Sequence, residues 1–162
     1  MYDERFVTPM RQELTRLGVV ELRTAADVDA TLKDAPGTAL VVVNSVCGCA
    51  ARNARPAVAR ALASATAVPD KLTTVFAGQD HEATERARSL FAGYAPSSPS
   101  IALLKDGRVA FMLERFQIEG RSADAIAQDL TTAFARHCAA RPSGSGDGAK
   151  SGAEPAAVPS PS

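Results

Sequence analysis

The chain has 162 residues, of which 46% are hydrophobic and 22% are charged. This length supports one ordinary domain with a hydrophobic core, and two domains would be cramped. Lysine and arginine together number 18, as do aspartate and glutamate, so the net charge is zero and lacks the basic excess typical of a nucleic-acid-binding protein.

The first part of the chain predicts a helix followed by a short strand. Thr8 is a suitable N-cap, and Pro9 after it is typical of the first position of a helix. Apolar residues then recur at helical spacing until Gly18, which marks the end of the helix. Residues 19–22 are short and apolar, and they predict a strand.

The next segment predicts a second helix and a deeply buried strand. Thr24 and Asp27 form a capping-box pattern at the start of the helix. Residues 38–44 read TALVVVN, a β-rich apolar run without alternation, which predicts a strand buried on both faces. An alanine-rich helix is expected over residues 49–66.

The last part of the domain predicts three strands and two helices. Residues 72–77 form a strand pattern, and Asp80 is a suitable cap for the helix that follows. Residues 101–104 and 109–113 flank a KDGR turn and predict a hairpin. Ser122 is a suitable cap for the final helix.

The order of these elements favours an α/β protein. The first four predicted strands alternate with helices, which favours parallel crossovers, whereas the last two form a hairpin. We therefore expect a mixed sheet that is covered by helices on both faces.

The composition changes after residue 141. Residues 142–162 contain 13 Pro, Gly or Ser among 21 residues and almost no large apolar side chain. Such a segment buries too little apolar area to offset its ordering entropy. We predict a folded domain over residues 1–141 and a disordered tail over residues 142–162.

Targeting signals and cysteine number indicate the compartment. The sequence has no run of 18 apolar residues, so we expect no transmembrane helix and no membrane partner. Its first ten residues carry acidic side chains and no apolar stretch, which predicts no signal peptide. Three cysteines form no even disulfide framework. We therefore expect a cytoplasmic protein without structural disulfides.

The strongest chemical signal is Cys47-Gly48-Cys49, between the buried strand and the helix. Unpaired N–H groups at a helix start stabilise a thiolate. Gly48 allows a tight bend and keeps side chains away from an incoming substrate. Two cysteines this close can exchange disulfides, one attacking and the other resolving. Arg52 and Arg55, on the same helix, add positive potential, and either could hold the carboxylate of a small acidic thiol.

Other interpretations of the C-x-C pattern stay open. Two closely spaced cysteines can hold a soft metal ion such as Cu(I), or zinc, and the protein would then be a metal-binding module. A non-catalytic redox adaptor, whose disulfide state changes partner binding, would carry the same pair. No spacing of cysteine and histidine in the chain matches a standard zinc site, so we assign no metal ligands.

A second signal is the proline in Ser98-Pro99 that precedes the predicted strand at residues 101–104. If this peptide bond is cis, the backbone of Ser98 would lie beside the cysteine turn and could pair with an extended substrate. The alternative is an ordinary trans proline in a loop. On the first interpretation, Ser98 and Pro99 join Gly48 and Arg52 as candidate substrate-binding residues.

Together these segments resemble a known fold and family. The strand that ends in C-G-C, its helix and SPSIALLKDG at residues 98–107 resemble the thioredoxin fold, in which a redox pair faces a cis-proline. More narrowly, the chain resembles the bacilliredoxin family over residues 2–138. The resemblance implies a three-layer thioredoxin-like α/β fold with a central mixed sheet, helices on both faces and an extra N-terminal helix. The matching segments are residues 2–4, 7–14, 41–49, 98–107, 118–121, 133–134 and 137–138.

The resemblance also implies a reaction. Proteins of that family remove bacillithiol, a low-molecular-weight thiol, from mixed disulfides on other proteins. It implies that Cys47 attacks and takes bacillithiol onto itself, and that Cys49 or a second bacillithiol molecule resolves the adduct. Bacillithiolated client proteins are the implied partners, bacillithiol is the co-substrate, and no other cofactor is needed. Weak disulfide isomerase activity and a cis bond before Pro99 are implied as well.

Two positions depart from related patterns. Members of the family often have histidine where this chain has Phe116, so a proton-transfer or thiol-binding role for that histidine is missing here. Thioredoxins carry a buried aspartate near the position of Val41, which helps to deprotonate the second cysteine. Its absence argues against a general thioredoxin-like reductase.

The remaining polar candidates are interpreted as structural. Cys138 lies on the apolar stripe of the last helix, where a free cysteine usually packs as a small hydrophobic residue. His137 is expected at the surface or in packing, and His81 in a loop. Asn44 and Ser45 lie at the end of the buried strand and could hydrogen-bond near the thiolate. Glu119 and Arg121 match a family segment, and a capping or salt-bridge role explains them as well as a functional one.

Overall fold

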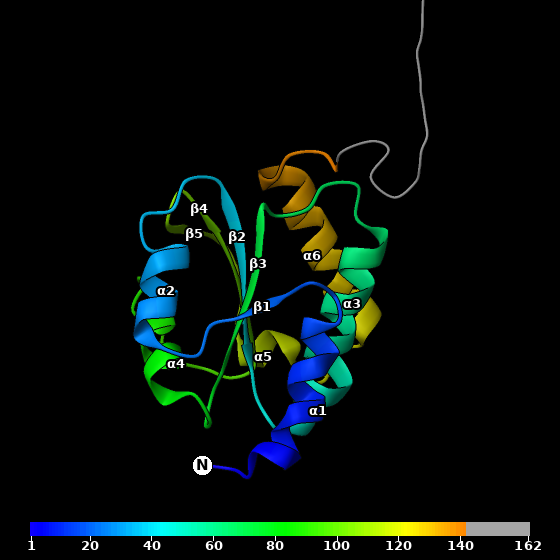
Figure 1. The fold of residues 1–162 in the computed structure, drawn as a ribbon. Helices are drawn as coiled ribbons and strands as arrows, with labels where there is room; N and C mark the ends of the chain where they lie inside the picture. Colours follow the sequence, from blue (N-terminus) through cyan, green and yellow to red (C-terminus); the bar gives the residue numbers. More distant parts are fainter. Residues whose placement is uncertain (142–162) are drawn as a thin grey trace, which may run out of the picture.

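The computed structural model describes residues 1–141, which form a five-stranded mixed sheet between two layers of helices (Figure 1). The strands are β1 (Val20–Glu21), β2 (Thr38–Asn44), β3 (Lys71–Phe76), β4 (Ser100–Lys105) and β5 (Arg108–Leu113). The helices are α1 (Glu4–Thr15), α2 (Ala25–Leu32), α3 (Arg55–Ser64), α4 (His81–Arg88), α5 (Arg115–Ile118) and α6 (Ala123–His137), and a π-helical turn, η1 (Ala50–Ala54), precedes α3. The predicted tail at 142–162 lies outside the described residues.

The sheet has the order β1-β3-β2-β4-β5, which places β2 at its centre. Strands β1, β3 and β2 are parallel, whereas β4 is antiparallel to β2 and β5 is antiparallel to β4. The predicted mixed sheet and the predicted β4–β5 hairpin are therefore confirmed.

The prediction that the fourth strand is parallel is wrong. Phe76, the last residue of β3, pairs with Asn44, and Ser100, the first residue of β4, pairs with Val43. Strand β3 therefore ends, and β4 begins, at the same end of the sheet. Helix α4 and residues 89–99 connect these two points and bring the chain back to that end. As a result, the Ser98–Pro99 segment lies beside the residues that follow β2.

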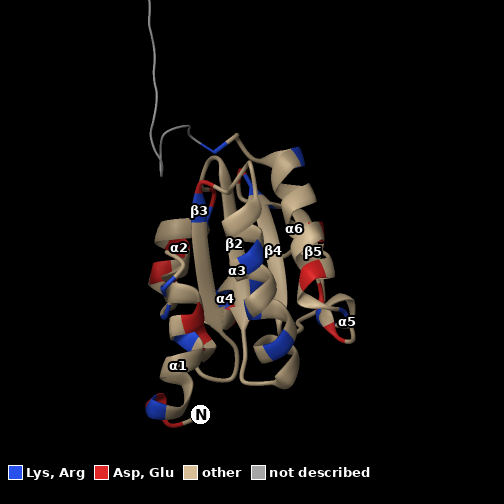
Figure 2. Cartoon of the chain, turned by 90° about the vertical axis from the view of Figure 1, so that its right-hand side faces the viewer, with Lys and Arg blue, Asp and Glu red and all other residues tan. Residues whose placement is uncertain are grey.

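Both faces of β2 are buried, as its unbroken apolar run predicts. Leu40 and Val42 belong to a core cluster with side chains of α1, α3 and α6. Val41 and Val43 point the other way, into a cluster with α2 and α4. This alternation follows from the two-residue period of a strand. In Figure 2, β2 is without charged positions, and the charged residues lie on helices, loops and strand ends.

Helix α1 begins earlier than the Thr8–Pro9 pattern predicts. The Asp3 carboxylate caps it by accepting a hydrogen bond of 2.8 Å from the Arg5 N–H. The Thr8 hydroxyl donates instead to the Glu4 carbonyl, one turn back. Pro9 sits inside the helix on its exposed side, where the carbonyl that loses its usual N–H partner can bind water.

The predicted helix over residues 49–66 is divided in two. In η1, the Arg55 N–H bonds to the Ala50 carbonyl, five residues back, and α3 then continues from Arg55 to Ser64. Pro56 explains the change of register. It has no backbone N–H to donate, and in the first turn of a helix the N–H groups have no partner within that helix. Pi-helical turns of this kind often occur at functional sites.

Asp80 precedes α4 as predicted, but its side chain does not cap the helix. It pairs instead with Arg11 of α1, at 2.7 Å, and Arg11 also bonds to Glu4 and Glu21. The Arg11 guanidinium is only 5% exposed and lies over the Phe76 ring. A long-range ion pair has therefore replaced the local cap and fixes α1 to the sheet. Ser122, by contrast, caps α6 as predicted.

Over residues 1–141, the described helices are all too short or too polar to cross a membrane.

We expect Arg11→Met to destabilise the protein by about 3 kcal/mol, because the nearly buried Asp80 carboxylate would lose its closest cation and keep only Arg23, at 3.7 Å. Urea unfolding monitored by circular dichroism measures the change. The control is Arg5→Met, which removes an exposed pair with Asp3 and should leave the midpoint nearly unchanged. Equal midpoints for Arg11→Met and wild type would contradict the structural role of this network.

Candidate active site

The C-G-C segment forms a tight turn between the carboxyl end of β2 and η1. The Cys47 carbonyl accepts hydrogen bonds from the N–H groups of Ala50 and Ala51, both at 3.1 Å. Cys47 therefore stands at the start of a helical turn, as the sequence predicts. Its side chain and that of Cys49 are partly exposed, and both thiols are free. An incoming disulfide can reach them from solvent.

Hydrogen bonds favour the thiolate of Cys47. The Ser45 hydroxyl oxygen accepts from the Cys47 N–H and lies 3.1 Å from Cys47 Sγ, where it can donate to a thiolate. Burial alone would raise the pKa of Cys47. The Ser45 hydroxyl, the N–H groups of Ala50 and Cys49, and the charge of Arg115 outweigh burial, so the pKa of Cys47 lies below that of an ordinary cysteine.

Cys49 is in the opposite electrostatic situation. Its Sγ donates to Glu119 Oε2 at 3.8 Å. Burial raises the pKa of Cys49, and the negative charges of Cys47 and Glu119 raise it further. At neutral pH the pair thus consists of a thiolate-prone Cys47 and a protonated Cys49, as exchange with one attacking and one resolving sulfur requires.

Arg115 connects the two cysteines to the proline loop. Its Nε bonds to Glu119 Oε2 at 3.2 Å, and its Nη1 bonds to the Ser98 carbonyl at 2.9 Å. Arg115 belongs to none of the motifs from which the site is predicted. The strand order β2-β4-β5 explains its position. Ile101 pairs with Leu113, so the end of β5, and with it Arg115, lies beside the start of β4.

The predicted cis-proline is present, and the Ser98–Pro99 bond is cis. Ser98 and Cys47 line the same hollow of about 290 Å³, so the structure brings together the two signals found in the sequence. The Ser98 carbonyl keeps a second lone pair besides the one that accepts from Arg115. An extended substrate could therefore still pair with this backbone.

The two arginines of the helix differ in position. Arg55 is only 2% exposed and bonds to Glu13, the Asn44 side chain and the Ser45 carbonyl. Arg55 is therefore not available to a substrate carboxylate, because three acceptors hold it inside the molecule, and its contribution to the potential at the thiol stays a prediction.

Arg52 is exposed, and its guanidinium covers Gly48, where an added Cβ would lie 2.7 Å from Nη2. Gly48 thus leaves room for Arg52 beside the cysteines. Arg52 does not line the hollow that contains Cys47, and its substrate-binding role stays a prediction.

Other candidates lie apart from this site. Cys138 directly follows α6 and packs against the core, where burial raises its pKa. His81 is the first residue of α4 and not in a loop, and His137 is the last residue of α6. Among residues 1–141, no three His, Cys, Asp or Glu side chains are grouped closely enough to hold a metal ion.

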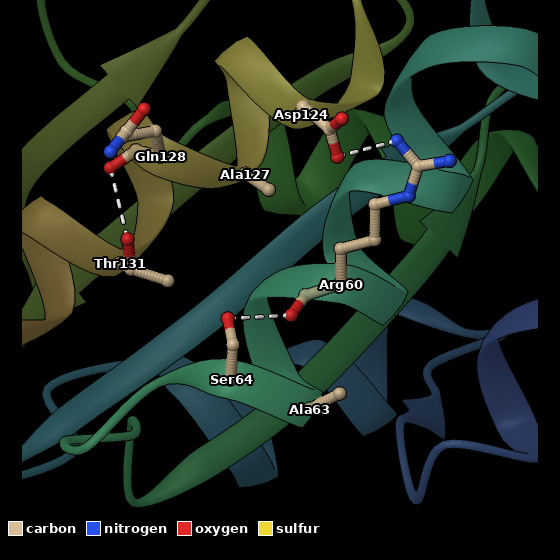
Figure 3. A pocket seen from close by; sticks show the side chains of 7 residues that line it. All are labelled: Arg60, Ala63, Ser64, Asp124, Ala127, Gln128 and Thr131. Carbon is tan, nitrogen blue, oxygen red and sulfur yellow. Dashed lines mark hydrogen bonds and ion pairs between the residues drawn. The ribbon is translucent and has the colours of Figure 1, made fainter.

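A hollow of about 480 Å³ lies between α3 and α6, away from the cysteines (Figure 3). The ion pair between Arg60 and Asp124 crosses it at 2.7 Å, and small or neutral side chains make up the rest of its lining. It contains neither a thiol nor a histidine, so it offers no group for redox chemistry.

Comparison with known proteins identifies the family. A family model described as disulphide isomerase matches residues 2–138. A bacilliredoxin of Salinibacter ruber is 56% identical over 138 residues, which cover 85% of this chain and 81% of the relative. A bacilliredoxin of Bacillus licheniformis is 53% identical, with 85% and 95% covered, and one of Staphylococcus aureus is 51% identical, with 87% and 96% covered. The chain belongs to the bacilliredoxin family.

The predicted family, fold and enzyme class are therefore confirmed, and this bacilliredoxin-family protein is a thiol–disulfide oxidoreductase. The solution structure of oxidised thioredoxin from Plasmodium falciparum superimposes with a TM-score of 0.51 at 18% identity, covering 72% of this chain and 98% of that one. This likeness shows a thioredoxin-like fold. Phe116 lies on α5 with 71% of its surface exposed, and its side chain has no group that can transfer a proton.

We expect Ser45→Ala to raise the pKa of Cys47, because the thiolate loses a hydroxyl donor. The measurement is the rate of iodoacetamide alkylation of each cysteine as a function of pH, followed by mass spectrometry. In the wild type, Cys47 should react at lower pH than Cys49. Ser64→Ala removes a hydroxyl that bonds only to its own helix, and it should leave both profiles in place. An unchanged Cys47 profile in Ser45→Ala would contradict this assignment.

We expect Glu119→Gln to lower the pKa of Cys49, because a neighbouring negative charge is removed and Arg115 is no longer neutralised. The pKa of Cys47 should fall in the same direction, since Arg115 acts on both sulfurs. The same alkylation profiles test this expectation. Asp124→Asn, which breaks a remote exposed pair, is the matched control. A rise in the pKa of Cys49 would overturn the electrostatic account.

Proposed function

We propose that this protein removes bacillithiol from mixed disulfides on client proteins through the thiolate of Cys47. The observation that carries the proposal is a partly exposed sulfur with a lowered pKa, held at a helix start and opening onto a hollow of about 290 Å³. The relatives named bacilliredoxin support bacillithiol as the small thiol. Since the reaction needs a reduced Cys47, the reducing cytoplasm is the compartment we propose.

In the first exchange, the Cys47 thiolate attacks the bacillithiol sulfur of the mixed disulfide. A bond forms between this sulfur and Cys47 Sγ while the disulfide bond to the client breaks. The client cysteine leaves as a thiolate and takes a proton from solvent. Gly48 leaves the approach open, and the Ser98–Pro99 backbone offers a surface for the client chain. Arg52, at the rim, stays a candidate contact for substrate.

In the second exchange, Cys49 releases the adduct. Its proton passes to the Glu119 carboxylate, 3.8 Å away, and the resulting thiolate attacks Cys47 Sγ. The Cys47–Cys49 disulfide forms and bacillithiol departs as a thiolate. A second bacillithiol molecule can replace Cys49 in this step, which gives bacillithiol disulfide and regenerates Cys47 directly. In the first route, a thiol reductant must reduce the Cys47–Cys49 disulfide.

A second candidate function is disulfide isomerase activity, which the description of the matching family model favours. The same Cys47 thiolate would then attack a disulfide between two cysteines of a client protein. The two functions differ in substrate: one removes a small thiol, and the other rearranges protein disulfides.

We expect Cys47→Ser to abolish release of bacillithiol from a bacillithiolated client, because no attacking sulfur remains. Cys49→Ser should instead accumulate a Cys47–bacillithiol adduct that whole-protein mass spectrometry detects. Cys138→Ser is the matched control, since this cysteine packs against the core away from the site, and it should keep full activity.

Full activity in Cys47→Ser would overturn the proposal, and an adduct on Cys49 in place of Cys47 would reverse the order of attack. A parallel assay with scrambled ribonuclease as the substrate tests the second candidate function, disulfide isomerase activity. Refolding of ribonuclease without any release of bacillithiol from the client would favour the isomerase.

A further inference from the structure

We propose that Arg88 binds a carboxylate of the small thiol, so that the hollow beside Cys47 selects low-molecular-weight thiols that carry a negative charge. The inference rests on the proposed function and names the class of thiol that it accepts.

The hollow that contains Cys47 has a one-sided charge distribution. Arg88 and Arg115 both line it, and its lining includes neither aspartate nor glutamate. The side chain of Arg115 is already engaged, because Glu119 and the Ser98 carbonyl accept its hydrogen bonds. Arg88 therefore supplies the positive charge that a ligand can neutralise.

Arg88 is poorly satisfied by the protein itself. Its Nη2 donates to the Ser97 carbonyl at 3.2 Å, and no carboxylate among residues 1–141 forms a salt bridge with it. Within the described part of the chain, Arg88 Nε is the only buried side-chain nitrogen or oxygen without a hydrogen-bond partner. A partly desolvated guanidinium with an unused donor is costly to keep, and an anion beside it would offset that cost.

Other arginines that are partly or fully buried pair with carboxylates, unlike Arg88. Arg86, two residues earlier on α4, makes two hydrogen bonds to the Asp29 carboxylate, at 2.7 and 2.9 Å. Arg11 and Arg55, which are the most buried arginines, also pair with carboxylates. Arg88 also lines a second hollow together with Glu82 and Glu85, but neither of these carboxylates forms a salt bridge with it. The acid that Arg88 lacks is therefore one that a ligand can bring.

The size and wall of the hollow fit a small molecule. Its volume of about 290 Å³ is close to the lower end of the range for small-ligand pockets. Tyr2 forms part of the wall, and its backbone is fixed by two hydrogen bonds to the Gln79 side chain, at 2.8 and 3.0 Å. The wall is thus present before any ligand arrives, and a thiol joined to Cys47 can extend toward Arg88.

A guanidinium recognises a carboxylate through charge-assisted hydrogen bonds, often two in parallel. An uncharged thiol of the same size would leave Arg88 as it is. The structure therefore favours a thiol with a carboxylate, a class that includes bacillithiol, over a neutral thiol of similar shape.

The test compares two substrates that differ in one charge. Mixed disulfides of one client with N-acetylcysteine and with its methyl ester are offered to the full chain, and kcat/KM is measured for each. Wild type should prefer the acid about 10-fold, the value expected for one charge-assisted hydrogen bond. Arg88→Gln should reduce this ratio to near one, mainly by raising KM for the acid, and Arg88→Lys should restore part of it.

The matched control is Arg86→Gln, which removes a guanidinium of the same helix that faces Asp29. It should keep the wild-type ratio. If Arg88→Gln lowered kcat/KM for both substrates in equal proportion, Arg88 would have a structural role through Ser97, and the inference would be overturned. A ratio near one in the wild type would overturn it as well. In either case, turnover of bacillithiolated client by the wild type would leave the proposed function standing, whereas its absence would refute that function separately.

Discussion

The buried guanidinium of Arg55 is the constraint on which the cysteine turn depends. A cation removed from water requires acceptors on several sides, and this one finds them on α1, on the last residue of β2 and on the Ser45 carbonyl. The same contacts fix where β2 ends and how the chain enters the turn. Breaking such a buried pair is costly, so the position of Ser45, and through it that of Cys47, is set by the core.

The two sulfurs differ because their neighbours differ, although only one residue separates them. Cys47 faces a hydroxyl and backbone N–H groups, whereas Cys49 faces a carboxylate. The pair of Arg115 and Glu119 lies between these environments and acts on both. A small α5 helix after the last strand thus determines much of the chemistry at the end of the second strand.

Local patterns predict the fold well wherever local physics decides it. The apolar run of β2, the KDGR turn of the β4–β5 hairpin and the Ser122 cap are where the sequence indicates. The structure departs from these patterns where a side chain pairs with a residue that is distant in the sequence. Asp80 pairs with Arg11 in place of capping its helix, and Arg55 pairs with Glu13 inside the molecule. No spacing in the sequence reports such pairs. The same is true of Arg115, whose place beside the thiols follows from strand order, and of β4, whose direction depends on how α4 returns the chain.

Cys138 has a consequence for the oxidised states of the molecule. It lies near Thr38 and Asp70, at the amino end of β2, whereas Cys47 follows the carboxyl end of the same strand. A strand of this length separates the two thiols by about 20 Å, several times the span of a disulfide. While the chain stays folded, a disulfide within the molecule can therefore form only between Cys47 and Cys49. Cys138 adds no competing crosslink to the redox cycle.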